Sequence, residues 1–329
     1  MTLLSALLRM GLIAPGDSPP LVALPGGVSS DIYRVDLPKG PICVKRALAR
    51  LKVSADWQVP VERNRSEVVW MRAAAAIDPV FVPRVLGEDA RSGTFAMEYL
   101  APDDHPVWKA QLRDGIIDPK VAAELARRIA RVHRATAGSA EVARQFATDP
   151  IFQSIRIEPY LLATASRHPD CAGALTRLAE ITVANKRALV HGDVSPKNIL
   201  VGPNGPILLD AECAWYGDPA FDLAFCLNHM LLKCLWRPQW RDRYLACFDS
   251  LAGAYLALAD WEPAAEIEER TARLLPGLFL GRVDGKSPAE YVTDERDRDR
   301  VRKVARALLL HPVATLAAVH DAWREELQG

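Results

Sequence analysis

The residues best suited to chemistry lie between positions 188 and 224. Asp193, Asn198 and Asp210 follow or precede short apolar runs, at 188–190, 199–201 and 207–209, that are long enough only for brief strands. A carboxylate, an amide oxygen and a second carboxylate are hard oxygen ligands of the kind that Mg²⁺ prefers. A carboxylate that stays free of the metal can accept the proton of an attacking hydroxyl. The spacing therefore predicts that one loop region holds both the ligands of a metal ion and a separate carboxylate that acts as a base.

Enzymes of phosphoryl transfer, protein kinases among them, divide the work in this way. Here His191-Gly192-Asp193 and Asp210-Ala211-Glu212 replace the His-Arg-Asp and Asp-Phe-Gly of protein kinases. Together with Asn198 and the run from Gly217 to Ala224, the pattern resembles the aminoglycoside phosphotransferase and choline kinase-like family of small-molecule kinases. The stretch from Lys45 to Glu67 is similar to methylthioribose-kinase-like members. The alternative is a strand–loop–strand with incidental acidic residues.

The resemblance implies an α+β, bilobal protein-kinase-like fold. A small β-rich N-terminal lobe, 1–100, would bind the nucleotide, and a larger, mostly helical C-terminal lobe, 101–329, would carry the catalytic loop and the acceptor site. ATP would bind between the lobes with Mg²⁺, and its γ-phosphate would move to a hydroxyl of a sugar, amino alcohol or antibiotic. Asp193 would orient that hydroxyl and accept its proton. Asn198 and Asp210 would hold Mg²⁺, with Glu212 as a further metal or water ligand.

The expected nucleotide contacts lie in the first 100 residues. A turn at Gly26, Gly27, Ser29 and Ser30 offers backbone N–H groups to phosphate oxygens. A plain hairpin turn is the alternative, and the resemblance favours the phosphate-covering loop. Lys45, at the end of an apolar strand, would contact phosphates and would be held by a glutamate of the following helix.

Two glutamates compete for that role, and the alignment with methylthioribose-kinase-like members selects Glu67 over Glu62. Either one could simply pair with arginines at helical spacing. The backbone of Glu98 and Leu100 would meet adenine, a prediction that rests on their position alone, just before 101–104.

Three more residues of the catalytic region have supporting roles. His191 is expected to shape the loop, because the adjacent Asp193 already fills the role of base. Asp222 resembles the family aspartate that braces this loop. Lys197 lies between Asp193 and Asn198, where a cation meets the transferring phosphoryl group, or where it is simply solvated.

The acceptor is the least constrained part of the prediction. Segments expected near the cleft carry the candidate contacts Arg156, His229, Arg282 and Lys286 beside acidic residues. That mixture favours a neutral or anionic hydroxylated metabolite over a polycationic aminoglycoside. The charges at 282–286 either face the cleft or form a solvated turn. Ser287 to Glu290 is interpreted as a capping box that starts a helix. The run at 281–287 resembles a Walker A phosphate loop but has one residue too few between its glycines, so no second nucleotide site is expected there.

The elements that must position these residues are strands within 21–47 and at 94–100, and helices at 61–76, 118–134, 158–166, 171–185, 221–234, 241–259, 294–310 and 313–327. His133, at helical spacing with Leu125 and Ile129, is expected to be a satisfied core histidine. The first 13 residues are expected to form a short packing helix.

Bulk composition narrows the class of protein. The 41 basic residues balance 41 acidic residues, so no global field favours nucleic acid. Nowhere do 18 apolar residues run together, so no membrane span is expected. The six cysteines form no Cys-x-x-Cys pair and indicate reduced thiols of a cytoplasmic protein. The main alternative function is a nucleotide-binding pseudokinase that regulates or scaffolds, and a metal-dependent hydrolase is less favoured.

Overall fold

A five-stranded antiparallel sheet forms the N-terminal part of the computed structural model, which describes residues 2–25, 30–48 and 63–329. The strands run in the spatial order β1-β2-β3-β5-β4. Their bounds are β1 Leu21–Ala23, β2 Ser30–Leu37, β3 Gly40–Ala47, β4 Val85–Asp89 and β5 Thr94–Glu98. Every neighbouring pair is antiparallel, so hairpins suffice to connect most of the sheet.

Alternation along β3 directs Lys45 toward the rest of the molecule. Ile42 and Val44 pack with Leu3 and Leu7 of helix α1 (Leu3–Arg9) on one face of the sheet. Side chains on a strand alternate between faces, so Cys43 and Lys45 point the other way. Helix α2 (Arg63–Ile77) contacts β3 and β5. The predicted N-terminal packing helix and the predicted strands are therefore confirmed.

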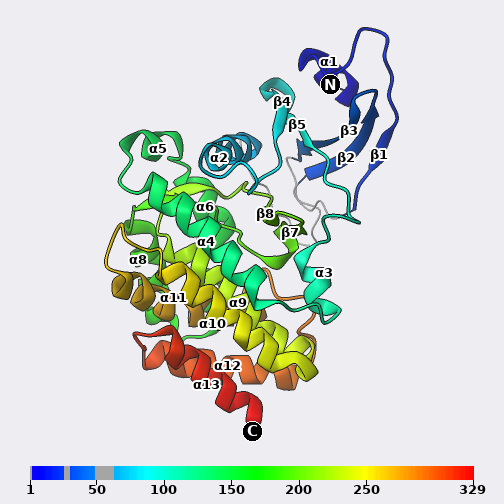
Figure 1. The fold of residues 1–329 in the computed structure, drawn as a ribbon. Helices are drawn as coiled ribbons and strands as arrows, with labels where there is room; N and C mark the ends of the chain where they lie inside the picture. Colours follow the sequence, from blue (N-terminus) through cyan, green and yellow to red (C-terminus); the bar gives the residue numbers. More distant parts are fainter. Residues whose placement is uncertain (1, 26–29, 49–62) are drawn as a thin grey trace.

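Helices make up most of the remaining chain and lie below the sheet in Figure 1. The longer ones are α4 Pro119–Thr136, α8 Ala172–Ala184, α9 Ala220–Trp236, α10 Arg241–Leu256, α11 Ala264–Asp284, α12 Glu295–Leu310 and α13 Leu316–Gln328. The shorter ones are α3 Trp108–Arg113, α5 Ala140–Gln145, α6 Asp149–Phe152 and α7 Ala163–Arg167, with the π-helix η2 Gln153–Leu162 between α6 and α7. Asp118 caps α4 by accepting from the Lys120 N–H, as predicted.

Two further antiparallel sheets, each of two strands, lie in the chain between α8 and α9. Strand β6 (Ala188–Val190) pairs with β9 (Trp215–Gly217), and β7 (Ile199–Gly202) pairs with β8 (Gly205–Leu208). These strands agree closely with the apolar runs read from the sequence. The loops between them carry the polar residues of interest, so the strands fix where those residues lie.

Helix α9 is buried on all sides, from Ala220 to Leu235. A helix that is apolar all round belongs in a core. The polar side chains it does carry, among them Asp222, His229 and Lys233, are therefore buried and need partners or a ligand.

The predicted capping-box helix at 287–290 is wrong. Helix α11 runs through Arg282 to Asp284, and the next helix begins only at Glu295, where Asp294 accepts from the Arg296 N–H. The Ser287 hydroxyl is not available as a cap because it accepts from the Arg282 guanidinium at 3.2 Å. The charges at 282–284 are thus buried in a helix end and do not form a solvated turn.

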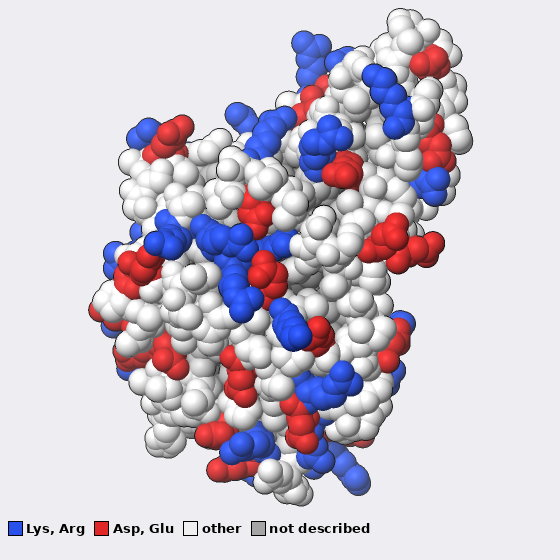
Figure 2. Space-filling model, viewed as in Figure 1, with Lys and Arg blue, Asp and Glu red and all other residues white. Residues whose placement is uncertain are grey.

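Charges of both signs are interleaved over the face drawn in Figure 2, with basic side chains gathered over α4. Those of α4 are locally neutralised: Arg127 and Arg131 pair with Glu124, and Arg134 pairs with Asp260. In the part of the chain that the structure describes, no helix is both long and apolar enough to cross a membrane.

Candidate active site

The loop after β6 is held by the first turn of α9. Asp222 is fully buried, and its two carboxylate oxygens accept the backbone N–H groups of His191 and Gly192, each at 2.8 Å. Gly192 has a φ of 80°, and a Cβ there would lie 2.8 Å from the Cys213 carbonyl oxygen. Only glycine fits such a position without strain. The loop geometry is therefore fixed by one buried carboxylate and one glycine.

His191 shapes the loop through both ring nitrogens. Nδ1 accepts the Asp193 N–H at 3.1 Å, so Nε2 carries the proton and donates to the Leu209 carbonyl oxygen at 3.1 Å. Trp70 of α2 packs against the ring edge-to-face, with centroids 4.7 Å apart. Burial lowers the pKa of His191, so the ring is neutral in this setting.

Asp193 is a buried carboxylate between two cations. Arg156 Nη2 lies 3.0 Å and Lys197 Nζ 3.2 Å from its Oδ2. Burial alone would raise the pKa of Asp193, but Lys197 and Arg156 outweigh it and hold the pKa well below its usual range. The group is therefore a carboxylate, able to accept a hydrogen bond from a hydroxyl.

Asn198 lies just before β7 and Asp210 just after β8, and the pairing of these two strands brings the two residues together. The Leu209 N–H donates to the Asn198 carbonyl oxygen at 2.9 Å, which ties the end of β8 to the turn before β7. Asn198 Nδ2 donates to the Asp193 carbonyl oxygen at 3.1 Å. Asp210 itself has a φ of 68°, in the left-handed region. Non-glycine residues held there cluster at functional sites.

Lys45 joins the sheet to this loop region. Its Nζ donates to Glu67 Oε2 at 2.7 Å and also to Asp210 Oδ1. Burial would lower the pKa of Lys45, but the charges of Asp210, Glu67 and Glu212 raise it above its usual range. Burial raises the pKa of Glu67 to about 7, because a cation shared among several carboxylates only partly offsets it. Lys45 therefore stays charged at every physiological pH.

Asn198, Asp210 and the half-buried Glu212 supply oxygen donors that suit Mg²⁺. In the described ranges no three or more His, Cys, Asp or Glu residues gather as a metal site. Mg²⁺ at phosphate-transfer sites is bound by one or two carboxylates together with substrate phosphates, so it needs no such cage. The donor set therefore fits a magnesium ion that is completed by a nucleotide.

The remaining predicted nucleotide contacts are less informative. Ser30 is buried at the start of β2. Glu98 ends β5 and Leu100 follows it, at the chain connection toward α3. Gly26, Gly27 and Ser29 lie outside the described residues, so their predicted role is untested.

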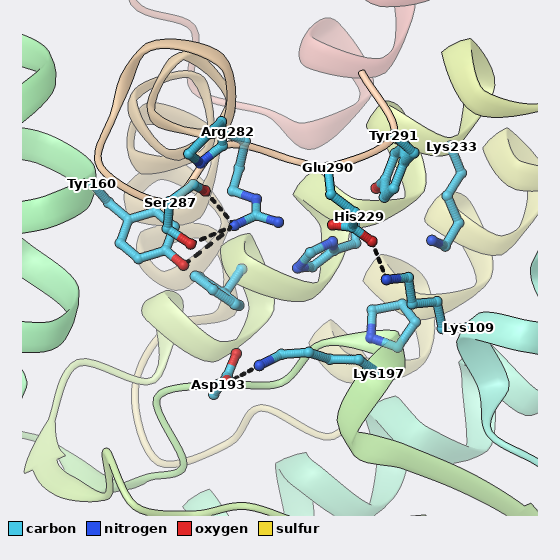
Figure 3. A pocket seen from close by; sticks show the side chains of 13 residues that line it. Lys109, Tyr160, Asp193, Lys197, His229, Lys233, Arg282, Ser287, Glu290 and Tyr291 are labelled. Carbon is cyan, nitrogen blue, oxygen red and sulfur yellow. Dashed lines mark hydrogen bonds and ion pairs between the residues drawn. The ribbon is translucent and has the colours of Figure 1, made fainter. Parts of the chain in front are cut away.

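A cavity of about 180 Å³ opens beyond Asp193 (Figure 3). Asp193, Lys197, His229 and Arg282, all predicted from the sequence, are among its lining residues. Lys109, Tyr160, Phe225, Lys233, Glu290 and Tyr291 also line it.

The other predicted acceptor residues do not line this cavity. Arg156 is buried against the loop that follows β6, where it binds Asp193 and the Gly192 carbonyl oxygen. Lys286 pairs with Glu158 at 2.7 Å, with about half of its side chain exposed. Asp284 turns away toward His168 and Arg302.

The sequence reasoning missed Lys109, Lys233 and Tyr291. Lys233 lies four residues after His229, one helical turn along α9, so helical spacing offered a signal for it. Lys109 and Tyr291 come from segments far apart in the chain, and no local pattern indicates that they meet. His133 is buried between Tyr255 and Asp222, as expected of a satisfied core histidine.

A family model and several relatives of known name resemble this chain, and both comparisons indicate phosphotransferases. The model of the phosphotransferase enzyme family matches residues 20–261. A methylthioribose kinase of Yersinia enterocolitica is 28% identical over 58% of this chain and 54% of its own length. One from Erwinia tasmaniensis is 27% identical over 74% of this chain and 69% of its own. The chain spans about half the length of the first of these relatives.

Two solved structures share the fold. An aminoglycoside phosphotransferase from Alicyclobacillus acidocaldarius has a TM-score of 0.50 at 16% identity, covering 100% of this chain and 97% of that one. Amicoumacin kinase hAmiN, in complex with AMP-PNP, Ca²⁺ and Ami, has a TM-score of 0.54 at 14% identity, covering 92% and 91%. At these identities the likeness concerns the fold alone. The predicted α+β, protein-kinase-like fold is confirmed.

Proposed function

The chain belongs to the phosphotransferase enzyme family, and from that premise we propose that it is a kinase of small molecules, transferring the γ-phosphate of ATP to a hydroxyl group. One observation carries the proposal. Lys45 of the sheet reaches Glu67 and Asp210, while Asn198 binds the backbone of Asp193. A phosphate-binding cation, a metal-binding pair and a carboxylate base thus lie in one connected network.

Asp193 accepts a hydrogen bond from the acceptor hydroxyl, orients it and takes its proton. The low pKa of Asp193 makes it a weak base, so its larger contribution is alignment of the nucleophile. Lys197, 3.2 Å from Asp193 Oδ2, also offers positive charge to the phosphoryl group in transfer. Lys45 binds the other phosphates of the nucleotide.

Asn198 and Asp210 would hold Mg²⁺, with Glu212 as a further metal or water ligand. When bound, the ion supplies positive charge that neutralises the phosphate oxygens. The chain's own residues provide the rest: Asp222 keeps the loop in place and Glu67 keeps Lys45 extended toward the nucleotide.

We assign residues 1–100 to nucleotide binding and 101–329 to the catalytic loop and the acceptor. The backbone of Glu98 and Leu100 would meet the adenine. A pseudokinase is not favoured, because such a protein is expected to lack the base, the metal aspartate or the lysine. Lys45, Asp193 and Asp210 are all present.

Calorimetry with ATP, with and without Mg²⁺, followed by an ADP-release assay over hydroxylated compounds, tests the proposal. We expect tight binding only when Mg²⁺ is present, and ADP release only when an acceptor is added. Absence of ATP binding in both conditions would overturn the kinase assignment. ADP release that is equally fast without any acceptor would indicate an ATP hydrolase instead.

A further inference from the structure

We propose that the acceptor carries an anionic group, a carboxylate or a phosphate ester, that Arg282 and Lys233 bind while the acceptor's hydroxyl meets Asp193. This inference rests on the proposed kinase function, since it concerns the second substrate of that reaction. It goes further by assigning that substrate a negative charge, opposite to the charge of a polycationic aminoglycoside.

Positive charge exceeds negative charge in the lining of the cavity. Four cations, Lys109, Lys197, Lys233 and Arg282, face two carboxylates, Asp193 and Glu290. Both carboxylates are already engaged: Asp193 pairs with Lys197 and with Arg156 below it, and Glu290 pairs with Lys109. Arg282 and Lys233 are left to face the cavity without a carboxylate of their own (Figure 3).

Lys233 is the stronger observation. Its exposed fraction is 1%, yet none of the ion pairs of the described residues includes it. Its Nζ lies 4.8 Å from the ring centroid of Trp236 and 4.9 Å from that of Tyr291. Burial, together with the neighbouring Lys109 and Arg282, lowers the pKa of Lys233 to about 7, and the charge of Glu290 offsets this only in part. A buried ammonium without a counter-ion is costly, and an anionic ligand would remove that cost.

Arg282 is held in place by Nη1, and its Nη2 has no hydrogen-bond partner among the described residues. Nη1 donates to the Ser287 carbonyl at 2.5 Å and contacts its hydroxyl at 3.2 Å. The guanidinium also lies over the Tyr160 ring, 5.9 Å from its centroid. Nε is buried and has no acceptor within the described ranges. A guanidinium fixed in this way is preorganised to donate from Nη2 to a carboxylate or phosphate oxygen, and such a charge-assisted hydrogen bond is stronger than a neutral one.

His229 lies between these two cations in Figure 3. Burial, then Arg282 and Lys233, lower the pKa of His229 well below its usual value. The ring is therefore neutral at physiological pH and can donate one hydrogen bond to an oxygen of the ligand.

The cation pair faces the acceptor and not the nucleotide. Every lining residue of the cavity comes from position 109 or later, and the cavity meets the catalytic loop at Asp193 and Lys197. Lys45 and Asp210, the expected nucleotide and metal contacts, do not line it. At about 180 Å³ the cavity is smaller than the roughly 300–1,000 Å³ typical of drug-sized ligands, which suits a small metabolite.

The test measures ligand binding with Mg²⁺ and ADP at saturation, so that only the acceptor side is open. The probes share one carbon skeleton: glycerol 3-phosphate, glycerate and neutral glycerol, each titrated by calorimetry or ligand-observed NMR. We expect at least one of the anions to bind more tightly than glycerol. Whichever of the two anions binds more tightly shows whether the site prefers a phosphate ester or a carboxylate.

Arg282→Gln should weaken binding of that anion by about tenfold to a hundredfold, the usual loss for one charged hydrogen bond. Lys233→Met should act in the same direction, and it supplies a second variant in case the first does not fold. The matched control is Arg273→Gln, which removes the same charge from the same helix α11 at an exposed pair with Glu269.

Equal binding of glycerol and the anions, absence of binding by either anion, or unchanged affinity in both Arg282→Gln and Lys233→Met would overturn the inference. Failure of ADP itself to bind with Mg²⁺ would instead count against the proposed kinase function. In that case the same anion titrations of the nucleotide-free protein still decide whether the cavity binds anions.

Discussion

Two buried lysines lie in contrasting surroundings, one in the network of Asp210 and the other in the cavity that Asp193 lines. Lys45, 3% exposed, donates to two carboxylates of the chain, Glu67 and Asp210. Lys233, 1% exposed, lies against aromatic rings and has no acidic partner among the described residues. The pKa of the first is raised, and that of the second is lowered to about 7.

The contrast is that Lys45 is paired with carboxylates of the protein itself, whereas Lys233 is not. On the proposed nucleotide side the protein pairs Lys45 with its own carboxylates, so a metal and phosphates would exchange partners within an existing network. On the proposed acceptor side Arg282 and Lys233 have no carboxylate partner among the described residues, and we propose that an anionic ligand supplies one. Side chains whose charge the fold leaves unmatched are therefore the better guide to the acceptor.

The largest expected effect comes from Asp193, where the two sides meet. Asp193→Asn should lower kcat by roughly 10²–10⁴, because the carboxylate that aligns the acceptor hydroxyl and takes its proton is lost. Nucleotide affinity should stay nearly unchanged, because Asp193 does not contact Lys45 or Asp210 among the hydrogen bonds and ion pairs of the described residues. Turnover in the ADP-release assay checks this, and a loss below about threefold would argue against the role.

Replacing each lysine by methionine should change the free energy of unfolding differently for the two positions. Lys45→Met leaves the buried Glu67 without its cation, which costs about 3–5 kcal/mol when one partner of a buried pair is removed. Lys233→Met removes an unpaired buried charge, so it should be neutral or stabilising. Urea unfolding at pH 8, where Glu67 is mostly ionised, measures both free energies.

Equal destabilisation by the two methionine variants would contradict the contrast between the lysines. The exposed Lys303→Met serves as the control. Its ion pair with Glu326 lies at the surface, where such pairs contribute about 0–1 kcal/mol.

A smaller, pH-dependent effect should separate the two sides. The pKa of Lys233 in the free protein, about 7, lies below its ordinary value of about 10.4, so the side chain is charged below pH 7 and neutral above it. The charged groups that act on it are Lys109, Glu290 and Arg282. The KM of an anionic acceptor should therefore rise about tenfold as pH increases through 7.

Lys233→Arg should abolish this pH dependence, since arginine keeps its charge over the whole range. Glu67, with a pKa also raised to about 7, would be expected to affect the KM of ATP instead. An acceptor KM that does not change with pH in the parent protein would contradict the assignment of Lys233.

Much of the nucleotide side could be predicted from the sequence because its residues lie in local motifs. Asp193, Asn198 and Asp210 fall within one short stretch, bounded by strands whose apolar runs are visible. The choice of Glu67 depended on the resemblance to a family, and in the structure it contacts Lys45. The role of each residue remains a prediction.

The acceptor side could be predicted only in part because its residues are assembled by tertiary packing. Arg282 was selected from a charged cluster, yet its neighbours Asp284 and Lys286 turn elsewhere. The expected helix at 287–290 is absent because Ser287 binds Arg282 instead of capping a helix. Lys233 was hidden within an apolar run, and its lack of a carboxylate partner among the described residues is visible only once α9 is packed.

The central claim is that Asp193 serves the acceptor hydroxyl while Asp210 serves the metal and the nucleotide. Calorimetric titration of ATP at several Mg²⁺ concentrations, in the parent protein, Asp193→Asn and Asp210→Ala, tests it most directly. Asp193→Asn should retain Mg²⁺-dependent affinity, whereas Asp210→Ala should lose the dependence on Mg²⁺. Equal loss of ATP affinity in both variants would contradict the division of roles.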